Sequence, residues 1–187
     1  MKIILLNGPP RSGKDAAAEM LLSAIPDSVH VKFAEPLRRA LPELFGLSKD
    51  AWLDLYLNHK DEPAEELLGF SVRNRMIWLS EEVMKPVYGK DIFGHIAVNQ
   101  IRALGPNTVV ISDCGFPAEV VPLCEWFGEK SLLVIRLTRP GATFAGDSRN
   151  YVDMDNVESL TVPNDGSLID LKFKLLAAVT PWLTRSN

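Results

Sequence analysis

The residues of this chain that are best placed to do chemistry form a glycine-containing stretch near its start. Residues 8–15 read GPPRSGKD and match the first seven positions of the phosphate-binding loop pattern GxxxxGK[ST], with Asp15 in place of the usual Ser or Thr. An aliphatic run at 2–7 precedes the stretch, and good helix formers at 15–25 follow it. Glycines let backbone N–H groups converge on phosphate oxygens, and a helix N-terminus adds favourable partial charge. The expected phosphate contacts are Gly8, Arg11, Ser12, Gly13, Lys14 and Asp15.

Within this loop the side chains have different expected roles. Lys14 is expected to reach the β- and γ-phosphates and to neutralise charge as the γ-group departs, although a surface lysine at a helix start would look the same. Asp15 could hold Mg²⁺ directly or through its waters, or it could simply cap the helix. Arg11 and Ser12 lie inside the loop, where contact with phosphate and exposure to solvent are both open. The pattern favours ATP and Mg²⁺ as cofactors.

Charged side chains also follow the later predicted strands. Residues 109–113 form an aliphatic run that ends in Asp113, whose carboxylate could hold magnesium-bound water or an acceptor group, or could cap the next turn. The polar segment at 139–155 carries Arg139 and Arg149, which could place positive charge around a moving phosphate. Each arginine could equally form a surface ion pair. The catalytic candidates are therefore Lys14, Asp113, Arg139 and Arg149.

The remaining candidates concern the adenine and the acceptor. Backbone groups of Asn164 and Gly166, in the loop at 163–167, could contact adenine, while Asp165 or Ser167 could act there as a helix N-cap. Basic side chains from the first half of the chain, together with Asp113, are expected to bind the acceptor. The arginines that could hold an acceptor phosphate by bidentate contacts are Arg38, Arg73 and Arg75.

Hydrophobic periodicity predicts alternating strands and helices. Strands are expected at 2–7, 29–33, 108–112, 131–137 and 158–162. Helices are expected at 15–25, 35–45, 72–84, 91–104, 117–127 and 167–182, with a break at 86–90 and a weak pattern at 47–71. Such alternation implies right-handed βαβ units and a parallel sheet, with ligands beyond the carboxyl ends of the strands. We expect an α/β fold of the P-loop NTPase type, a three-layer α/β/α domain with a five-stranded parallel sheet over residues 1–187. A helical acceptor-binding insertion is expected at about 34–90 and a lid at about 139–155.

Composition narrows the class of protein. With a formal net charge of −4, the chain lacks the basic excess that coating of nucleic acid needs. Its two cysteines, Cys114 and Cys124, indicate neither a disulfide framework nor a zinc site, which favours the reduced cytoplasm. No apolar run reaches the roughly 18 residues that span a bilayer, and the apolar start at 1–6 is too short for a signal peptide. We expect a cytoplasmic protein with small-molecule nucleotide substrates and without nucleic-acid or membrane partners. A homodimer stays open.

Several segments together resemble the phage-type deoxynucleoside monophosphate kinases, a branch of the nucleoside monophosphate kinase fold. The matching segments occur in the expected order over nearly the whole chain, at 7–15, 33–38, Arg75 with 88–91, 113–119, 136–141 and 164–168. The resemblance implies ATP as donor, a deoxynucleoside 5′-monophosphate as acceptor and Mg²⁺ as cofactor. It further implies ADP and a deoxynucleoside diphosphate as products, and a location in the host cytoplasm if a phage encodes the chain.

The chain departs from this family pattern at two positions. Proteins of the group often carry an arginine where Gly115 stands, and Ala118 replaces the arginine that grips the monophosphate in adenylate kinases. Other arginines would have to take over these contacts. Two alternatives therefore stay open: another small-molecule P-loop kinase, similar to phosphomevalonate kinase, and a nucleotide-binding protein without turnover.

Overall fold

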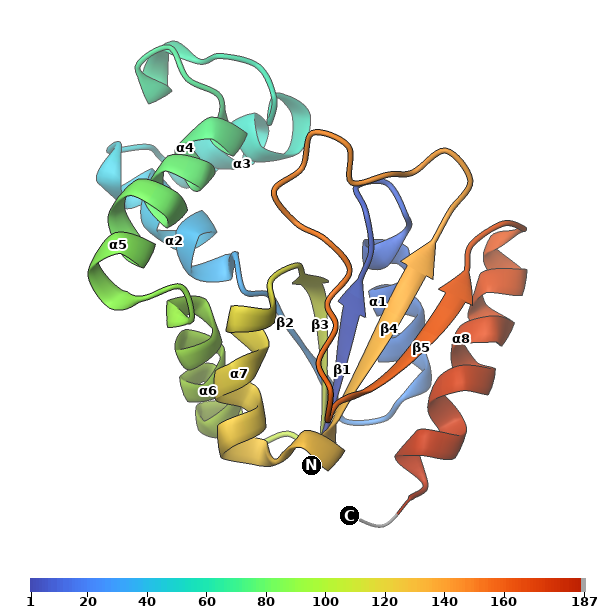
Figure 1. The fold of residues 1–187 in the computed structure, drawn as a ribbon. Helices are drawn as coiled ribbons and strands as arrows, with labels where there is room; N and C mark the ends of the chain where they lie inside the picture. Colours follow the sequence, from blue (N-terminus) through green and yellow to red (C-terminus); the bar gives the residue numbers. More distant parts are fainter. Residues whose placement is uncertain (186–187) are drawn as a thin grey trace. The chain divides into compact units, whose positions relative to one another are not determined.

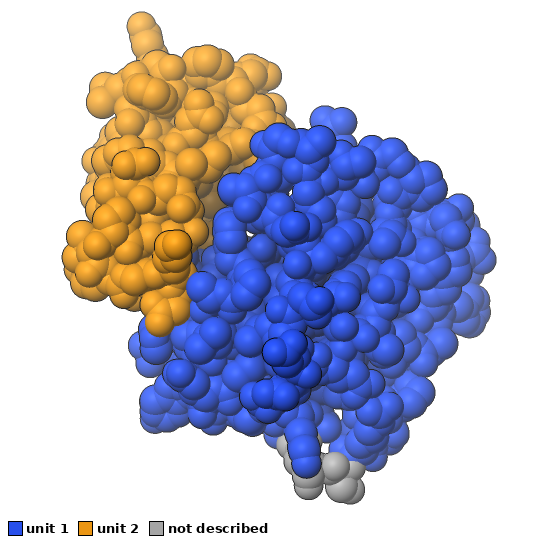
Figure 2. Space-filling view, in the orientation of Figure 1, with its two compact units in different colours: residues 1–33, 93–187 blue, residues 34–92 orange. Residues whose placement is uncertain are grey.

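The computed structural model of the chain describes residues 1–185 and divides into two compact units, which Figure 2 shows in different colours. Unit 1 comprises Met1–Phe33 together with the chain from Phe93 onward, and unit 2 comprises Ala34–Ile92. The bounds of unit 2 lie within two residues of those expected for the insertion at 34–90. Its acceptor-binding role and the organisation as a single kinase domain stay predictions.

Unit 1 is built on a five-stranded parallel sheet with the strand order β2-β3-β1-β4-β5, as Figure 1 shows. The strands are β1 Lys2–Asn7, β2 Ser28–Val31, β3 Thr108–Cys114, β4 Leu132–Thr138 and β5 Glu158–Pro163. The central strand is β1, in which Ile4 pairs with Val110 on one side and with Leu133 on the other. Its aliphatic side chains are buried on both faces, as expected for a strand inside a parallel sheet. The predicted sheet is confirmed.

Helices cover both faces of this sheet (Figure 1). The long helices of this part are α1 Lys14–Ala24, α6 Ile92–Leu104, α7 Pro117–Phe127 and α8 Leu168–Leu183, and η3 Glu129–Ser131 is a short 3₁₀ turn. On one face, Leu21 of α1 and Leu175 of α8 join the strands in one apolar core. On the other face α6 and α7 pack closely, because a Cβ on Gly94 would lie only 2.4 Å from the carbonyl oxygen of Glu119. The predicted three-layer α/β/α architecture is confirmed.

Unit 2 consists of helices and turns. They are α2 Glu35–Leu44, α3 Lys49–Asn58, the 3₁₀ turn η1 Glu65–Leu67, α4 Val72–Trp78, the π-helical turn η2 Leu79–Met84 and α5 Lys85–Tyr88. The helix α3 lies where the sequence pattern is weak. Ser48 caps it by accepting the N–H of Ala51, and only Trp52 among its residues is buried, which explains the weak periodicity. No helix within residues 1–185 is both long and apolar enough to cross a membrane.

The helical break expected at 86–90 is wrong at its start. The chain stays helical through Tyr88 and leaves the helix at Gly89, which has a φ of 99°. The N–H of Lys85 bonds to the carbonyl of Ser80, five residues earlier, so the hydrogen-bond register changes just before Pro86. Pro86 then lies in the first turn of α5. The N–H groups of a first turn have no acceptor within the helix, so the missing N–H of proline costs no hydrogen bond there.

Candidate functional site

The loop between β1 and α1 turns as a phosphate-binding loop must. Arg11 and Gly13 adopt left-handed backbone conformations, with φ of 64° and 99°. The N–H of Ser12 donates to the carbonyl of Pro9 at 3.2 Å and closes a tight turn. Left-handed residues in a tight turn are also found in the backbone loops that bind anions.

Both glycines of the loop pattern are required for space. A Cβ on Gly8 would lie 2.6 Å from the carbonyl oxygen of Leu137 on β4. A Cβ on Gly13 would lie 2.5 Å from the side-chain nitrogen of Asn164, in addition to the strain of a positive φ. That nitrogen donates to the carbonyl of Ser12 at 2.9 Å, so Asn164, the residue directly after β5, stabilises the loop.

Lys14 folds back over the loop. Its Nζ donates to the carbonyl oxygens of Gly8 and Pro9, both at 2.7 Å. The pKa of Lys14 is lowered, mainly by burial and secondly by the positive charge of Arg149. The negative charges of Asp15 and other carboxylates raise it. The ammonium group is thus held at the loop, where it can pass from carbonyl to phosphate oxygens.

The loop also carries hydrogen-bonding groups that lack a protein partner. The helix α1 begins at Lys14 with Gly13 as its N-cap and with no side-chain cap for its first N–H groups. Ser12 is completely buried, and its hydroxyl has no hydrogen-bond partner within residues 1–185. Unpaired buried hydroxyls are rare, and a helix N-terminus attracts anions. The oxygens of a phosphate would meet both needs.

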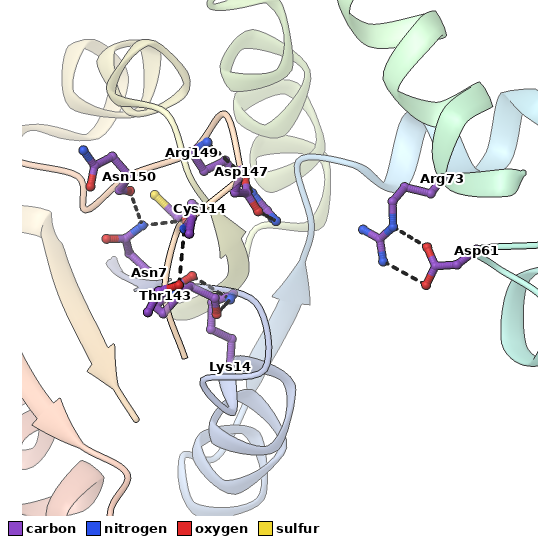
Figure 3. Close-up of polar contacts among 12 residues, drawn as sticks. Asn7, Lys14, Asp61, Arg73, Cys114, Thr143, Asp147, Arg149 and Asn150 are labelled. Atoms are coloured by element: carbon purple, nitrogen blue, oxygen red, sulfur yellow. Dashed lines mark hydrogen bonds and ion pairs between the residues drawn. The ribbon is translucent and has the colours of Figure 1, made fainter. Parts of the chain in front are cut away.

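Arg149 is the second cation of the site, and it forms an ion pair with Asp147 (Figure 3). Its Nε and Nη2 donate to the two carboxylate oxygens at 2.8 and 2.5 Å, and its backbone N–H donates to the first of them at 2.9 Å. This hydrogen bonding with Arg149 lowers the pKa of Asp147 to about 2. Arg149 therefore forms the ion pair that was the alternative prediction for it. It also lies close enough to Lys14 for its charge to lower the pKa of that residue.

Arg139 reaches the phosphate loop from the end of β4. Its Nη1 donates to the carbonyl of Arg11 at 3.2 Å, across 128 positions of the chain. The side chains of Arg11 and Arg139 are exposed. The fold thus brings Lys14, Arg139 and Arg149, which the sequence predicted to be catalytic, to the same end of the sheet (Figure 3 for Lys14 and Arg149).

The two candidate carboxylates have partners of their own. Asp15 forms an ion pair with Lys32 at 2.9 Å and does not cap α1, so the capping alternative is wrong for this residue. Asp113 accepts the backbone N–H of Phe33 at 2.9 Å and thereby joins the ends of β3 and β2. Within residues 1–185 no group of three or more His, Cys, Asp or Glu side chains is gathered that could hold a metal alone.

The loop after β5, which was predicted to contact adenine, makes hydrogen bonds that stabilise the fold. The backbone N–H of Asn164 is bonded to the carbonyl of Thr138 at 2.7 Å. Ser167 is the N-cap of α8 and forms a capping box with Asp170, which confirms the capping alternative. Gly166 lies beside this box, because a Cβ there would come within 2.8 Å of Asp170. Contact of Asn164 and Gly166 with adenine stays a prediction.

Two of the arginines expected to hold the acceptor are paired with carboxylates inside unit 2. Arg38 donates to both oxygens of Glu35, at 2.8 and 2.6 Å. Arg73 forms an ion pair with Asp61, drawn in Figure 3, and both side chains are more than half exposed to solvent. Exposed pairs of this kind exchange readily for another anion.

Arg75 is held differently. Its Nε and Nη2 donate to the carbonyl of Leu67 at 3.0 and 2.9 Å. Aromatic rings surround its guanidinium, with centroids 4.1 to 5.6 Å away, from Phe45, Phe70 and Trp78. This packing gives Arg75 a clear structural role within unit 2, while its role toward an acceptor stays a prediction.

Three residues of the site were not singled out as functional from the sequence. Asn7 hydrogen-bonds to β3 and to the segment that carries Arg149. Asp147 clasps Arg149, and Gly115 leaves room for it, since a Cβ there would lie 2.5 Å from Arg149 Cδ. A single polar residue ending a buried aliphatic strand, as at Asn7, is the signal that could have drawn attention to the first of them.

The chain is similar to known proteins in structure, but no sequence-based comparison finds a match. No protein-family model matches it, and no curated protein matches it. Among solved structures, it is similar to an unliganded sugar kinase from Janibacter sp. HTCC2649 at 11% identity, over 100% of this chain and 99% of that one, with a TM-score of 0.47. It is similar to thymidylate kinase from Candida albicans at 17% identity, over 96% and 91% of the chains, with a TM-score of 0.46. Both likenesses are too weak to bear on activity.

Proposed function

We propose that the chain transfers the γ-phosphoryl group of ATP to a small acceptor, and that the acceptor is a deoxynucleoside 5′-monophosphate. The observation that carries the first part is the loop at 8–15, which combines two left-handed residues, an uncapped helix start, a buried unpaired hydroxyl on Ser12 and the folded-back Lys14. The second part rests on the resemblance of segments such as 33–38 and 136–141 to the phage-type deoxynucleoside monophosphate kinases.

The proposed reaction asks little covalent chemistry of the protein. An oxygen of the acceptor phosphate forms a bond to the γ-phosphorus, and the bond from that phosphorus to the β–γ bridging oxygen breaks, so that ADP leaves with the bonding electrons. Lys14 and Arg149 would compensate the charge on the transferred group, and Arg139 would hold the phosphate loop in place. Asp113 would orient the acceptor.

Mg²⁺ fits the oxygen donors of this site. Asp15 and Asp113 are carboxylates whose charges both act on Lys14, and carboxylate oxygen is a preferred ligand of this ion. Asp15 would hold it, directly or through water, together with substrate phosphates. When bound, the ion would neutralise charge on the β- and γ-phosphates.

The arginines of unit 2 are the proposed ligands of the acceptor phosphate. Arg38 and Arg73 would exchange a carboxylate partner for phosphate oxygens, and Arg73 would do so at least cost because its pair with Asp61 is exposed. Arg75 would have to give up a bonded carbonyl and three aromatic contacts, so we place it last among the three.

The test is an ADP-release assay with ATP, Mg²⁺ and single acceptors. We expect saturable turnover with at least one of dGMP, dTMP and dCMP, and none with phosphomevalonate. The control is Lys14→Ala, which keeps the acceptor residues and removes the charge at the loop. Turnover with phosphomevalonate alone would overturn the acceptor class. Saturable ATP binding without turnover on any monophosphate would overturn the enzymatic assignment and leave a nucleotide-binding protein.

A further inference from the structure

Asn7, the last residue of β1, lies completely buried at the point where β1 enters the phosphate loop. Its Nδ2 donates to the carbonyl of Cys114 at 2.9 Å and to the carbonyl of Asn150 at 3.1 Å, while its Oδ1 accepts the N–H of Val152 at 2.9 Å. Figure 3 shows the first two of these bonds. All three partners are backbone groups more than a hundred positions away in the chain.

Only a primary amide matches this set of partners. Two carbonyl oxygens need two donors, and one N–H needs one acceptor; the amide of Asn7 supplies all of them in one planar group. A carboxylate would bring a second oxygen against two carbonyls, and an apolar side chain would leave all three backbone groups unpaired. The amide orientation is unambiguous for the same reason.

These bonds divide the segment at 139–155 into two parts. Val152 is buried, and its carbonyl also accepts from Arg136 at 3.2 and 2.8 Å, so the chain near 150–153 is fastened to the sheet from two sides. Residues 139–149 lie mostly at the surface, and Arg139 bonds to the phosphate loop through the carbonyl of Arg11. This less fastened part, 139–149, would be the closing part of the lid expected from the sequence, and its fixed end is at Asn150.

Arg149 is the residue directly before this fixed end. The aliphatic part of its side chain lies over Gly115, the residue after Cys114, whose carbonyl accepts from Asn7. Its positive charge is the second largest cause, after burial, of the lowered pKa of Lys14. We propose that Asn7 is a positioning residue that sets Arg149 against the phosphate loop through the backbone of Asn150 and Val152. The inference rests on the proposed function for its catalytic consequence, but not for the anchoring itself.

Anchoring is tested without any turnover, by hydrogen–deuterium exchange of the peptide that contains Val152. In Asn7→Asp we expect its amide to exchange roughly tenfold faster than in the wild-type protein, because the second carboxylate oxygen is repelled by the carbonyls of Cys114 and Asn150 and displaces the oxygen that accepts the Val152 N–H. The matched control is Asn99→Asp, the same chemical change at an exposed position of α6, which should leave that peptide unchanged. If Asn7→Asp does not fold, Asn7→Ser replaces it, since a hydroxyl cannot satisfy all three partners. Unchanged exchange at Val152 in a folded variant would overturn the inference.

Positioning is tested by kinetics in the same variants. We expect Asn7→Asp to lower kcat about tenfold and to change the KM for ATP less than about threefold, and to add no further loss to an Arg149→Gln variant. A raised KM with full additivity would mean that Asn7 acts on the phosphate loop itself, and the inference would fail. Absence of turnover in the wild-type protein would instead refute the proposed function, and the exchange experiment would still decide the anchor.

Discussion

The stem of Arg149 occupies the space that a side chain at Gly115 would need. A Cβ built on Gly115 would lie 2.5 Å from Cδ and 2.7 Å from Cγ of Arg149. Gly115 directly follows β3 and lies two residues after Asp113. Arg149, from a distant segment, lies over this position, and it fits there because Gly115 has no side chain.

Gly115→Ala is therefore expected to displace Arg149 rather than to unfold the protein. Gly115 does not have a positive φ, so alanine brings no backbone strain, and the conflict is with a side chain that can move. We expect kcat to fall about tenfold with the thermal midpoint nearly unchanged. In an Arg149→Ala background Cδ and Cγ are removed and the nearest remaining atom of residue 149 is Cβ, at 3.3 Å, so Gly115→Ala should there have little further effect on kcat. A further tenfold loss in that background would show that position 115 acts independently of Arg149.

Lys14→Ala should lower turnover by at least about a hundredfold, because the transferred phosphoryl group loses its nearest fixed positive charge. The fold should persist, since the hydrogen bonds of Nζ within residues 1–185 go to carbonyls of the loop, those of Gly8 and Pro9. Steady-state kinetics and a thermal melt measure the two effects separately. Lys172→Ala, an exposed lysine on α8, is the control for loss of one positive charge. Near-normal turnover in Lys14→Ala would overturn the role of Lys14.

The sheet and the phosphate loop could be predicted because their signals are local. The run at 2–7 is aliphatic on both faces, the glycines at 8 and 13 have fixed spacing, and helix formers follow at once. Such patterns need no knowledge of the rest of the fold. The same logic failed at Pro86, where a π-helical turn moved the hydrogen-bond register and let the helix continue.

The connections that complete the site could not be predicted because they join distant positions. Asn7 meets Asn150 across 143 positions, and nothing in the neighbourhood of either residue signals the other. The contact of Gly115 with Arg149 likewise depends on where the loop after β4 returns to the sheet. The residue types of Arg139 and Arg149 could be picked out as candidates, but their partners, Arg11 and Asp147, required the structure.

Asp147 should contribute to stability in a defined range of pH. The hydrogen bonds from Arg149 lower its pKa from 3.8 to about 2 in the folded protein. A depressed folded-state pKa gives a contribution that is fully present above 3.8 and is lost as the pH falls toward about 2. Its upper limit is about 2 kcal/mol, from a shift of nearly two units.

Urea unfolding between neutral pH and the acid limit of folding measures this contribution. The free energy of unfolding of Asp147→Asn should fall less steeply in the acid range than that of the wild-type protein. Asp153→Asn removes a carboxylate of the same segment that is 89% exposed in its pair with Arg136, and it should leave the slope nearly unchanged. Identical slopes for wild type and Asp147→Asn would contradict the pairing of Asp147 with Arg149 in solution.

Lys32 should compete with Mg²⁺ for Asp15. Its ammonium lies 2.9 Å from the Asp15 carboxylate, so a metal ion that approaches this group, directly or through water, meets a cation already in place. In Lys32→Gln we expect the Mg²⁺ concentration for half-maximal turnover to fall about threefold, and in Asp15→Asn we expect it to rise by at least as much. Titration of nucleotide binding with Mg²⁺ gives a second measurement that does not depend on turnover. Lys130→Gln, an exposed lysine on η3 at the opposite end of β4, is the control. A shift of both Lys32→Gln and Asp15→Asn in the same direction would exclude Asp15 as the residue through which the protein holds the ion.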